Sequence, residues 1–502
     1  MHTQRYYVAL AFLLAASVAG PIRCQTRAID LSAAGTSINR RILGQNAYCG
    51  ISPSIRQRIL DVSYNNSIIG IAGGLYADTY NWKTLVACFT GPETTLQMMR
   101  EARDRNSDLV IIANVRGIGS PSGSSFAYTD KSVTTLSALA ADWVRYVNKI
   151  VPNFCQGEPI AGRDKQIVDS LQWGSSDKLP KIGDKPVRKV TYWEIGNEPE
   201  VNLDVWYGMS AEEYLSRYKA ISPAMLAEDP TIKIGPCITT VGSGGNAWLQ
   251  GVLNDPACKV DFVAYHPYGP LYWLTKNVSG GVLDAPTLES GLNYIKGQQQ
   301  TNKLNVVNAL VTAGRDPSTP LVLSEYNPES WEGIFYYGLH QTVAEALGEV
   351  ETIFTFAELG IHTAHFFVYP TYPSATIETP VCKVFEELQN YMGDKLMDSY
   401  SDGSFRLYTT KESSTGAVAL WAANMSDTLD KTLTISLTNL GFTPTQIKRM
   451  TLAATSGDTS LVTRNASSEV VNWTATNLLG QLDPSGFTMT FEDATLTLLI
   501  VR

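Results

Sequence analysis

Short apolar runs alternate with longer amphipathic segments up to about residue 400. Each run has the length of a buried strand, and each longer segment has the apolar spacing of a helix. Eight such runs predict an α/β fold, a (β/α)8 TIM barrel, because parallel strands need helical connections. The predicted strands are residues 42–48, 68–75, 109–115, 190–197, 232–238, 262–266, 321–326 and 364–369. The predicted helices include residues 133–150, 211–227, 288–313, 337–347 and 381–391.

The pattern changes after about residue 400, where turns rich in Gly, Ser, Asn and Asp separate short strands. This pattern predicts a C-terminal all-β sandwich domain. Its predicted strands are residues 405–408, 417–422, 431–437, 450–454 and 494–501. We therefore assign residues 25–398 to the barrel and residues 399–502 to the sandwich. Residues 28–31 either form an edge strand, which would join residues 25–40 to the sandwich, or belong to a free N-terminal segment.

Residues 1–24 have the features of a signal peptide. Arg5 is positively charged, residues 8–16 are apolar, and Ser17-Val18-Ala19 resembles a cleavage site. The apolar part is far shorter than the roughly 20 residues that cross a bilayer, and no later stretch is long enough either. We therefore expect a secreted, extracellular protein without a membrane anchor.

Export affects the interpretation of the cysteines and of the N-x-[ST] sequons. If Cys24 is lost with the signal, the remaining even number predicts disulfides of undetermined pairing. These cysteines are Cys49, Cys88, Cys155, Cys237, Cys258 and Cys382. No pair has C-x-x-C spacing, which disfavours zinc and redox sites. The sequons predict surface glycosylation unless they occur by chance, and they begin at Asn65, Asn277, Asn424, Asn465 and Asn472.

Two glutamates stand at the ends of apolar strands, Glu198 after the fourth and Glu325 after the seventh. In a barrel, side chains at the C-terminal strand ends converge on one face. Paired carboxylates there are what a retaining glycosidase requires. The alternative is two surface carboxylates, but both follow buried-looking strands. The net charge of −9 argues against nucleic acid, so a polysaccharide or oligosaccharide is the expected partner.

Three nearby glutamates are expected to have other roles. Glu194 shares the parity of Glu198 on one strand, so it points inward but lies deeper. A structural salt bridge is expected there. Glu200 and Glu329 lie in predicted loops and are expected to be solvated.

These motifs resemble those of clan A glycoside hydrolases, in which an Asn-Glu pair ends strand four and a Glu ends strand seven. The resemblance implies that Glu198 is the acid/base, that Glu325 is the nucleophile, and that Asn197 binds the 2-hydroxyl of the sugar. It also implies that Tyr268 supports the nucleophile. His266 belongs to the same motif, although it is alternatively a core imidazole. The clan A mechanism needs no cofactor, and neither a cofactor nor a metal is expected.

Residues 72–82 (AGGLYADTYNW) resemble a segment of family 51 and of the related family 39. Those families include α-L-arabinofuranosidases and β-xylosidases. The resemblance implies that Asp78, Tyr80 and Trp82 contact the sugar; alternatively, this loop braces the second strand. Residues 193–199 (WEIGNEP) instead resemble family 79, which includes heparanases and β-glucuronidases.

Two further tryptophans, Trp273 and Trp331, follow strands six and seven and either stack on sugars or pack internally. We predict a secreted retaining glycoside hydrolase that acts on cell-wall or matrix polysaccharide and is α-L-arabinofuranosidase-like. The alternatives are a β-glucuronidase or heparanase-like enzyme and a β-xylosidase. A catalytically silent carbohydrate-binding protein is a further alternative, although a binder has no need of both Glu198 and Glu325. The oligomeric state does not follow from the sequence.

Overall fold

The computed structural model describes most of the chain after the predicted signal peptide. The described residues are 25–47, 61, 68–71, 77, 80–85, 94–122, 125–201, 208–242, 245–269, 285–328, 343–367, 379–426, 429–453 and 473–502. Among their helices, none has the length and apolarity needed to cross a bilayer.

Eight parallel strands form a curled sheet in which the last of them, β12, pairs with the first, β3. The order around the closed sheet is β10-β11-β12-β3-β4-β5-β8-β9. Their bounds are β3 Gly44–Ala47, β4 Ile68–Ile71, β5 Asp108–Ala113, β8 Tyr192–Ile195, β9 Lys233–Ile238, β10 Val263–Tyr265, β11 Leu321–Tyr326 and β12 Thr363–Phe366. Each overlaps a predicted strand, which confirms the predicted α/β class.

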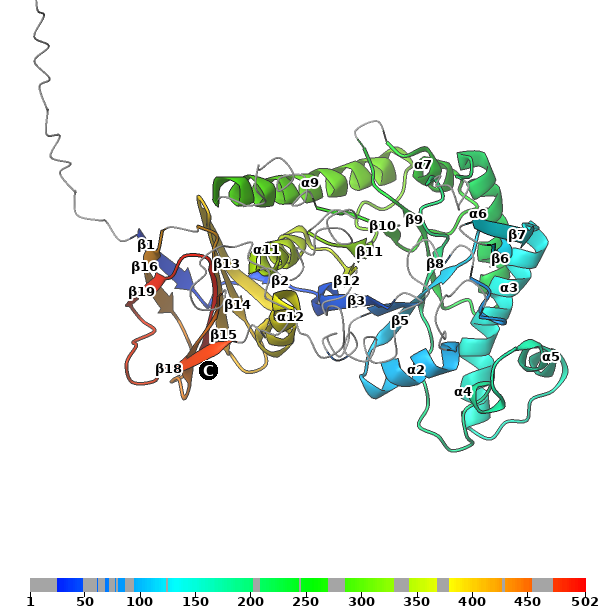
Figure 1. Cartoon of the computed structure of the whole chain (residues 1–502), viewed down its shortest axis with the longest axis horizontal. Helices are drawn as coiled ribbons and strands as arrows, with labels where there is room; N and C mark the ends of the chain where they lie inside the picture. Colours follow the sequence, from blue (N-terminus) through cyan, green and yellow to red (C-terminus); the bar gives the residue numbers. More distant parts are fainter. Residues whose placement is uncertain are drawn as a thin grey trace, which may run out of the picture.

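Helices lie around the outside of this sheet (Figure 1). They are α2 Thr95–Asp104, α3 Val133–Arg145, α4 Val151–Cys155, α5 Gly162–Ser170, α6 Ala211–Glu228, α7 Ala247–Asn254, α9 Ala285–Thr312, α11 Val343–Leu359 and α12 Pro380–Tyr391. A π-helical turn, Tyr146–Ile150, joins α3 to α4, and a hairpin of β6 (Ile118–Ser122) and β7 (Ser125–Asp130) precedes α3. The predicted helix at 337–347 overlaps α11, which continues to Leu359, and residues 337–342 lie outside the described residues. The buried Glu345, Glu349 and Glu351 interrupt the apolar spacing of α11.

The C-terminal residues form two further sheets. The larger has the order β18-β17-β20-β15-β14-β13-β2, and the smaller has the order β1-β16-β19. Their bounds are β1 Gln25–Asp30, β2 Thr36–Ser37, β13 Lys395–Asp402, β14 Phe405–Lys411, β15 Val418–Asn424, β16 Lys431–Thr438, β17 Ile447–Ala453, β18 Thr474–Asn477, β19 Phe487–Phe491 and β20 Thr495–Val501. The edge-strand alternative is the one observed, because β1 pairs in parallel with β16.

The central strands of the larger sheet, β14, β15 and β20, are buried on both faces. Leu499 and Val501 of β20 pack into the core shared with the smaller sheet, whereas Leu498 and Ile500 face the barrel cluster that includes α11. Polar contacts cross the same boundary: Arg406 forms a 3.3 Å ion pair with the buried Glu351. Figure 1 shows α11 and α12 between the barrel and the sheets.

Two predictions about export chemistry need correction. The described cysteines are buried and form no disulfide with one another, so disulfides among them are wrong; they are Cys155, Cys237, Cys258 and Cys382. Cys24, Cys49 and Cys88 lie outside the described residues.

The sequon at Asn424 is also wrong as a surface glycosylation site. Asn424 is 1% exposed, and its Nδ2 donates to the carbonyls of Leu429 and Phe491 at 2.9 and 3.1 Å. A glycan on that nitrogen would break both bonds inside the core. The sequons at Asn65, Asn277, Asn465 and Asn472, and the signal segment, lie outside the described residues.

Candidate active site

The structure brings Glu198 and Glu325 together at the C-terminal end of the barrel strands. Glu198 follows β8, and Glu325 lies near the end of β11, three places further along the order β8-β9-β10-β11. Single carboxylate oxygens of the two, together with a ring nitrogen of His266, all lie within 4.8 Å of one another. Glu325 is 3% exposed and the side chain of Glu198 is 15% exposed, so the pair is nearly enclosed by the described residues.

His266 and Tyr268, which follow β10, hold the two carboxylates. Nδ1 of His266 lies 2.7 Å from Oε1 of Glu198 and 3.7 Å from Oε2 of Glu325. The hydroxyl of Tyr268 donates to Oε2 of Glu325 over 2.7 Å. His266 is therefore a buried core imidazole and also a site residue, because its ring contacts the candidate acid/base. Asn197, the residue before Glu198, is fully buried.

A tight turn places Glu198. Gly196 has φ +81°, and a Cβ there would lie 2.6 Å from Cγ2 of Val115, so this position requires glycine. Glu198 itself has φ +46°, which is uncommon for a residue other than glycine. Strained backbone of this kind is found at functional sites.

Two buried arginines support that turn, and the sequence analysis missed both. Arg116 donates to the carbonyl of Glu198 at 2.6 Å and to that of Val201 at 3.2 Å. Arg217 donates in turn to the carbonyls of Val115 and Arg116. These contacts join β5 and α6 to the backbone of the acid/base candidate. No local motif indicated them, because the partners are about 80 to 100 residues apart.

The charges around His266 decide its protonation. Burial alone would lower the pKa of His266, but the acidic groups Cys237, Glu325 and Glu198 outweigh burial and raise it well above 6.5. Burial raises the pKa of the Cys237 thiol itself to about 12, so the thiol is neutral. The carboxylates are therefore the groups that favour the imidazolium.

The expectations for two neighbouring glutamates were wrong. No Lys or Arg pairs with Glu194 in the described part of the chain, so a salt bridge to such a residue is absent there; the basic side chain near this carboxyl is His266. Glu200 is half-buried rather than solvated. Its Oε1 accepts bonds from the amide and hydroxyl of Thr239 at 2.8 and 2.7 Å and from Asn246 at 3.1 Å.

Tyr80 and Trp82 pack against α3, as in the alternative in which this loop has a bracing role. Trp82 is fully buried, stacks on Trp143 with centroids 5.6 Å apart, and donates from Nε1 to the carbonyl of Leu139 at 3.0 Å. Tyr80 is 3% exposed and packs on the same Trp143 at 5.8 Å. Both rings brace the barrel against α3. Of the other site predictions, Asp78, Trp273, Trp331 and Glu329 lie outside the described residues.

Among the described residues, two sets of side chains have the spacing of metal ligands: Glu198, His266 and Glu325, and Glu194, Cys237 and His266. His266 belongs to both sets, and its Nδ1 already contacts Glu198. A cation bound by the first set would have to replace the contact between His266 and Glu198. The geometry fits a carboxylate pair held by hydrogen bonds without such a cation.

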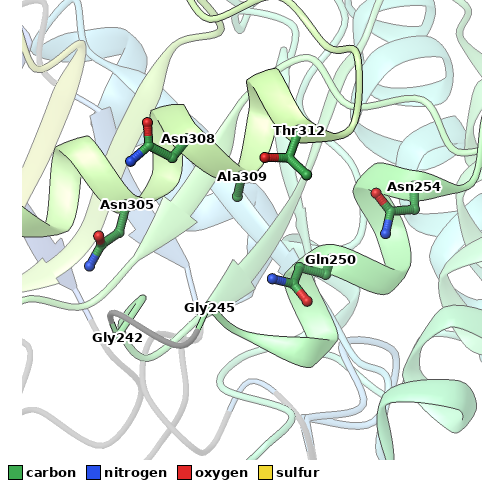
Figure 2. A pocket seen from close by; sticks show the side chains of 8 residues that line it. All are labelled: Gly242, Gly245, Gln250, Asn254, Asn305, Asn308, Ala309 and Thr312. Atoms are coloured by element: carbon green, nitrogen blue, oxygen red, sulfur yellow. The ribbon is translucent and has the colours of Figure 1, made fainter.

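A separate hollow of about 300 Å³ lies on the outer helices (Figure 2). Amide side chains of α7 and α9 line it, namely Gln250, Asn254, Asn305 and Asn308, with Gly242 and Gly245 at its rim. Neither Glu198 nor Glu325 borders it. The chemistry of the carboxylate pair therefore belongs to the barrel mouth and not to this hollow.

Comparison with known proteins places the fold. No protein-family model matches the sequence, and no curated protein sequence matches it significantly. Solved structures match along nearly the whole chain. A family 51 α-L-arabinofuranosidase from Bifidobacterium longum has a TM-score of 0.68 at 14% identity, over 95% of this chain and 99% of its own.

Two further solved structures have a similar fold. An α-L-arabinofuranosidase from Thermotoga maritima, in an arabinose complex, has a TM-score of 0.64 at 16% identity and covers 94% of this chain and 99% of its own. A bifunctional glucanase-xylanase from a metagenome library has a TM-score of 0.62 at 14% identity, with 95% and 99% covered. The chain therefore has the fold of the family 51 enzymes, which confirms the resemblance to clan A glycoside hydrolases.

Proposed function

We propose that the protein is a retaining glycoside hydrolase of the α-L-arabinofuranosidase type. The observation that carries the proposal is the approach of Glu198 and Glu325, whose carboxylate oxygens lie within 4.8 Å. Retaining enzymes hold their carboxyls about 5 to 5.5 Å apart, whereas inverting enzymes leave about 6.5 to 9.5 Å for a water. The short separation supports direct attack by one carboxylate.

The surroundings of the two carboxylates support different roles. Glu325 is the more deeply buried and accepts the hydroxyl of Tyr268, which stabilises its ionised, nucleophilic form. In the first step an oxygen of Glu325 bonds to the anomeric carbon, the bond to the leaving oxygen breaks, and that oxygen takes the proton of Glu198. In the second step Glu198 takes a proton from water, the water oxygen bonds to the anomeric carbon, and Glu325 is released.

A neutral pentosyl unit is the favoured glycone. Two of the similar structures are α-L-arabinofuranosidases, whereas the third acts as a glucanase and xylanase, so the scaffold alone does not select the sugar. A β-glucuronidase would need a cation for the uronate. Arg116, which contacts the turn, is fully buried and donates to backbone carbonyls. This use of Arg116 supports a neutral sugar.

A panel of aryl glycosides tests the substrate directly. The α-L-arabinofuranoside should be cleaved fastest, and the Glu325→Gln variant should be inactive on every substrate. Faster cleavage of the β-glucuronide or β-xyloside would support those alternatives instead. Binding of arabinan or arabinoxylan without cleavage of any glycoside would identify a silent carbohydrate-binding protein.

We also propose that the enzyme is secreted, on the basis of the charge and apolar pattern of residues 1–24. N-terminal sequencing of protein expressed in a eukaryotic secretory host should find cleavage near Ala19 to Cys24. A mature protein that begins at Met1 and stays inside the cell would contradict it.

A further inference from the structure

A chain of buried polar side chains lies beneath the two carboxylates. Its members come from four neighbouring strands: Glu194 in β8, Cys237 in β9, His266 after β10 and Ser324 in β11. Nε2 of His266 lies 3.0 Å from Oγ of Ser324 and 3.2 Å from Sγ of Cys237. One carboxylate oxygen of Glu194 lies within 4.8 Å of both Sγ of Cys237 and a ring nitrogen of His266. Glu194 is therefore within electrostatic reach of the imidazole that contacts Glu198.

Glu194 is an unusual carboxyl. It is fully buried, and the described side chains around its carboxylate are Ser324, Cys237 and His266 rather than a Lys or Arg. Burial raises the pKa of Glu194 to about 7, against the opposing charge of His266. A buried carboxylate is costly unless a nearby positive charge balances it. The imidazole of His266 is the neighbouring group that can supply this charge.

The other titratable groups around His266 cannot take that role. Glu198 and Glu325 are carboxyls, and burial keeps the thiol of Cys237 neutral by raising its pKa to about 12. The pKa of Tyr268 is raised by burial and by the two carboxyls, so its hydroxyl is also neutral. Burial lowers the pKa of His365, in β12, to about 3, so this second imidazole is uncharged. Among the side chains that face Glu194, the positive charge therefore resides on His266.

We propose that Glu194 is a positioning residue that holds a proton on His266 and so controls the protonation of Glu198. The role of Glu194 in catalysis rests on the proposed function, whereas its effect on the protonation of His266 is independent of that function. Because the ionised Glu194 keeps His266 protonated, the new negative charge on Glu198 faces an imidazolium when Glu198 gives its proton to the leaving oxygen. Glu198 takes a proton back from the attacking water in the second step, so Glu194 and His266 keep their charges over the cycle.

The first experiment measures the imidazole directly. The chain has only five histidines, so Cε1-labelled histidine gives an NMR spectrum with few signals, and a His266→Asn variant assigns the signal of interest. Loss of a neighbouring negative charge should lower the pH at which His266 titrates by about 1 to 3 units in Glu194→Gln. Glu194→Asp, which keeps the charge, should restore most of the wild-type value. An unchanged titration in Glu194→Gln would overturn the proposal.

A matched control separates this effect from the loss of any buried carboxyl. Glu349 is also fully buried, but it lies on α11 and accepts the hydroxyl of Tyr326 at 2.7 Å, outside the His266 chain. Glu349→Gln should leave the titration of His266 unchanged. If Glu194→Gln does not fold, titration of the wild-type protein still tests the proposal. His266 should stay protonated above pH 6.5, the ordinary pKa of histidine, and a neutral ring below that pH would overturn the proposal.

The second experiment reads the consequence for catalysis. Without Glu194 the ring of His266 loses its proton at a lower pH. Glu198 then faces a neutral imidazole and keeps its own proton to a higher pH. The alkaline limb of kcat/KM should therefore move up by about 1 pH unit in Glu194→Gln on a substrate with a poor leaving group. It should not move on an activated aryl glycoside, which needs little protonation. A shift on both substrates, or on neither, would contradict the positioning role. If wild type cleaves no glycoside, the proposed function fails, while the NMR titration still tests Glu194.

Discussion

The hydroxyl of Tyr268 donates a hydrogen bond to Oε2 of Glu325 over 2.7 Å. Burial, with the charges of Glu325 and Glu198, raises the pKa of Tyr268 well above 10, so the hydroxyl stays protonated as a donor. A fixed donor of this kind favours the ionised carboxylate. Tyr268 therefore keeps the proposed nucleophile charged beside a second carboxyl.

Removal of that donor should reduce activity without unfolding the protein. Tyr268→Phe should lower kcat/KM by about ten- to a hundredfold, since a hydrogen bond to a charged group contributes about 1.5 to 3 kcal/mol. The acid limb of the pH profile should also move to higher pH, because the ionised form has lost a partner. Steady-state kinetics across pH measures both effects. Tyr326→Phe, which loses only its contact with Glu349 on α11, is the control. Unchanged kinetics in Tyr268→Phe would contradict the assignment.

Trp82 should matter for stability and not for substrate binding. Its ring is fully buried between Trp143 and Tyr146, with centroid distances of 5.6 and 5.4 Å. Trp82→Ala should reduce the free energy of unfolding by about 3 to 5 kcal/mol, the range for large aromatic truncations, while Trp82→Phe should cost less. The folded variants should keep the wild-type KM. A raised KM with an unchanged melting temperature would restore Trp82 to the substrate site.

Glu349 should make the protein less stable as the pH rises. Burial raises the pKa of Glu349 from 4.5 to about 8 in the folded state. Between these values the native state binds more protons than the unfolded state, so the free energy of unfolding falls by up to about 1.4 kcal/mol per pH unit. Glu349→Gln should lose this slope, measured by urea unfolding at pH 5 and 7.5. Glu492→Gln, at an exposed carboxyl, should keep it. Equal slopes in wild type and Glu349→Gln would refute the buried, neutral carboxyl.

The sequence was sufficient for the barrel strands and for the two catalytic candidates, because both signals are local. An apolar run bounded by polar turns is visible within a few residues, and Glu198 and Glu325 each close such a run. The chain Glu194–Cys237–His266 was not predictable. Its members are 29 to 72 residues apart, and only the parallel pairing of β8, β9 and β10 brings them together.

Other positions differ from the sequence-based expectation for the same reason, because distant parts of the chain determine which side chains are buried. A motif places Trp82 in a loop but does not say which face the ring covers, and α3 provides a better partner than solvent. Asn424 matches a three-residue sequon, yet β15 is buried along its length. The end of α11 was predicted too early because Glu349 and Glu351 read as exposed positions, whereas Tyr326 and Arg406 satisfy them inside the core.

The two proposed catalytic glutamates should differ in their response to an added nucleophile. Glu325→Ala should lose nearly all activity, because no covalent intermediate can form. Glu198→Ala should still cleave activated aryl glycosides, and azide should accelerate it and yield a glycosyl azide of retained configuration. Product analysis by NMR distinguishes the variants. A retained-configuration azide from Glu325→Ala instead would reverse the two roles.

The stereochemistry of hydrolysis tests the central claim most directly. A double displacement by Glu325 and Glu198 inverts the anomeric carbon twice, so the first sugar released must have the configuration of the substrate. Proton NMR of the wild-type reaction, recorded before mutarotation, shows which anomer forms first. The account predicts the retained anomer. Initial release of the inverted anomer would contradict it, because a single displacement by water would then have replaced the proposed glycosyl-enzyme.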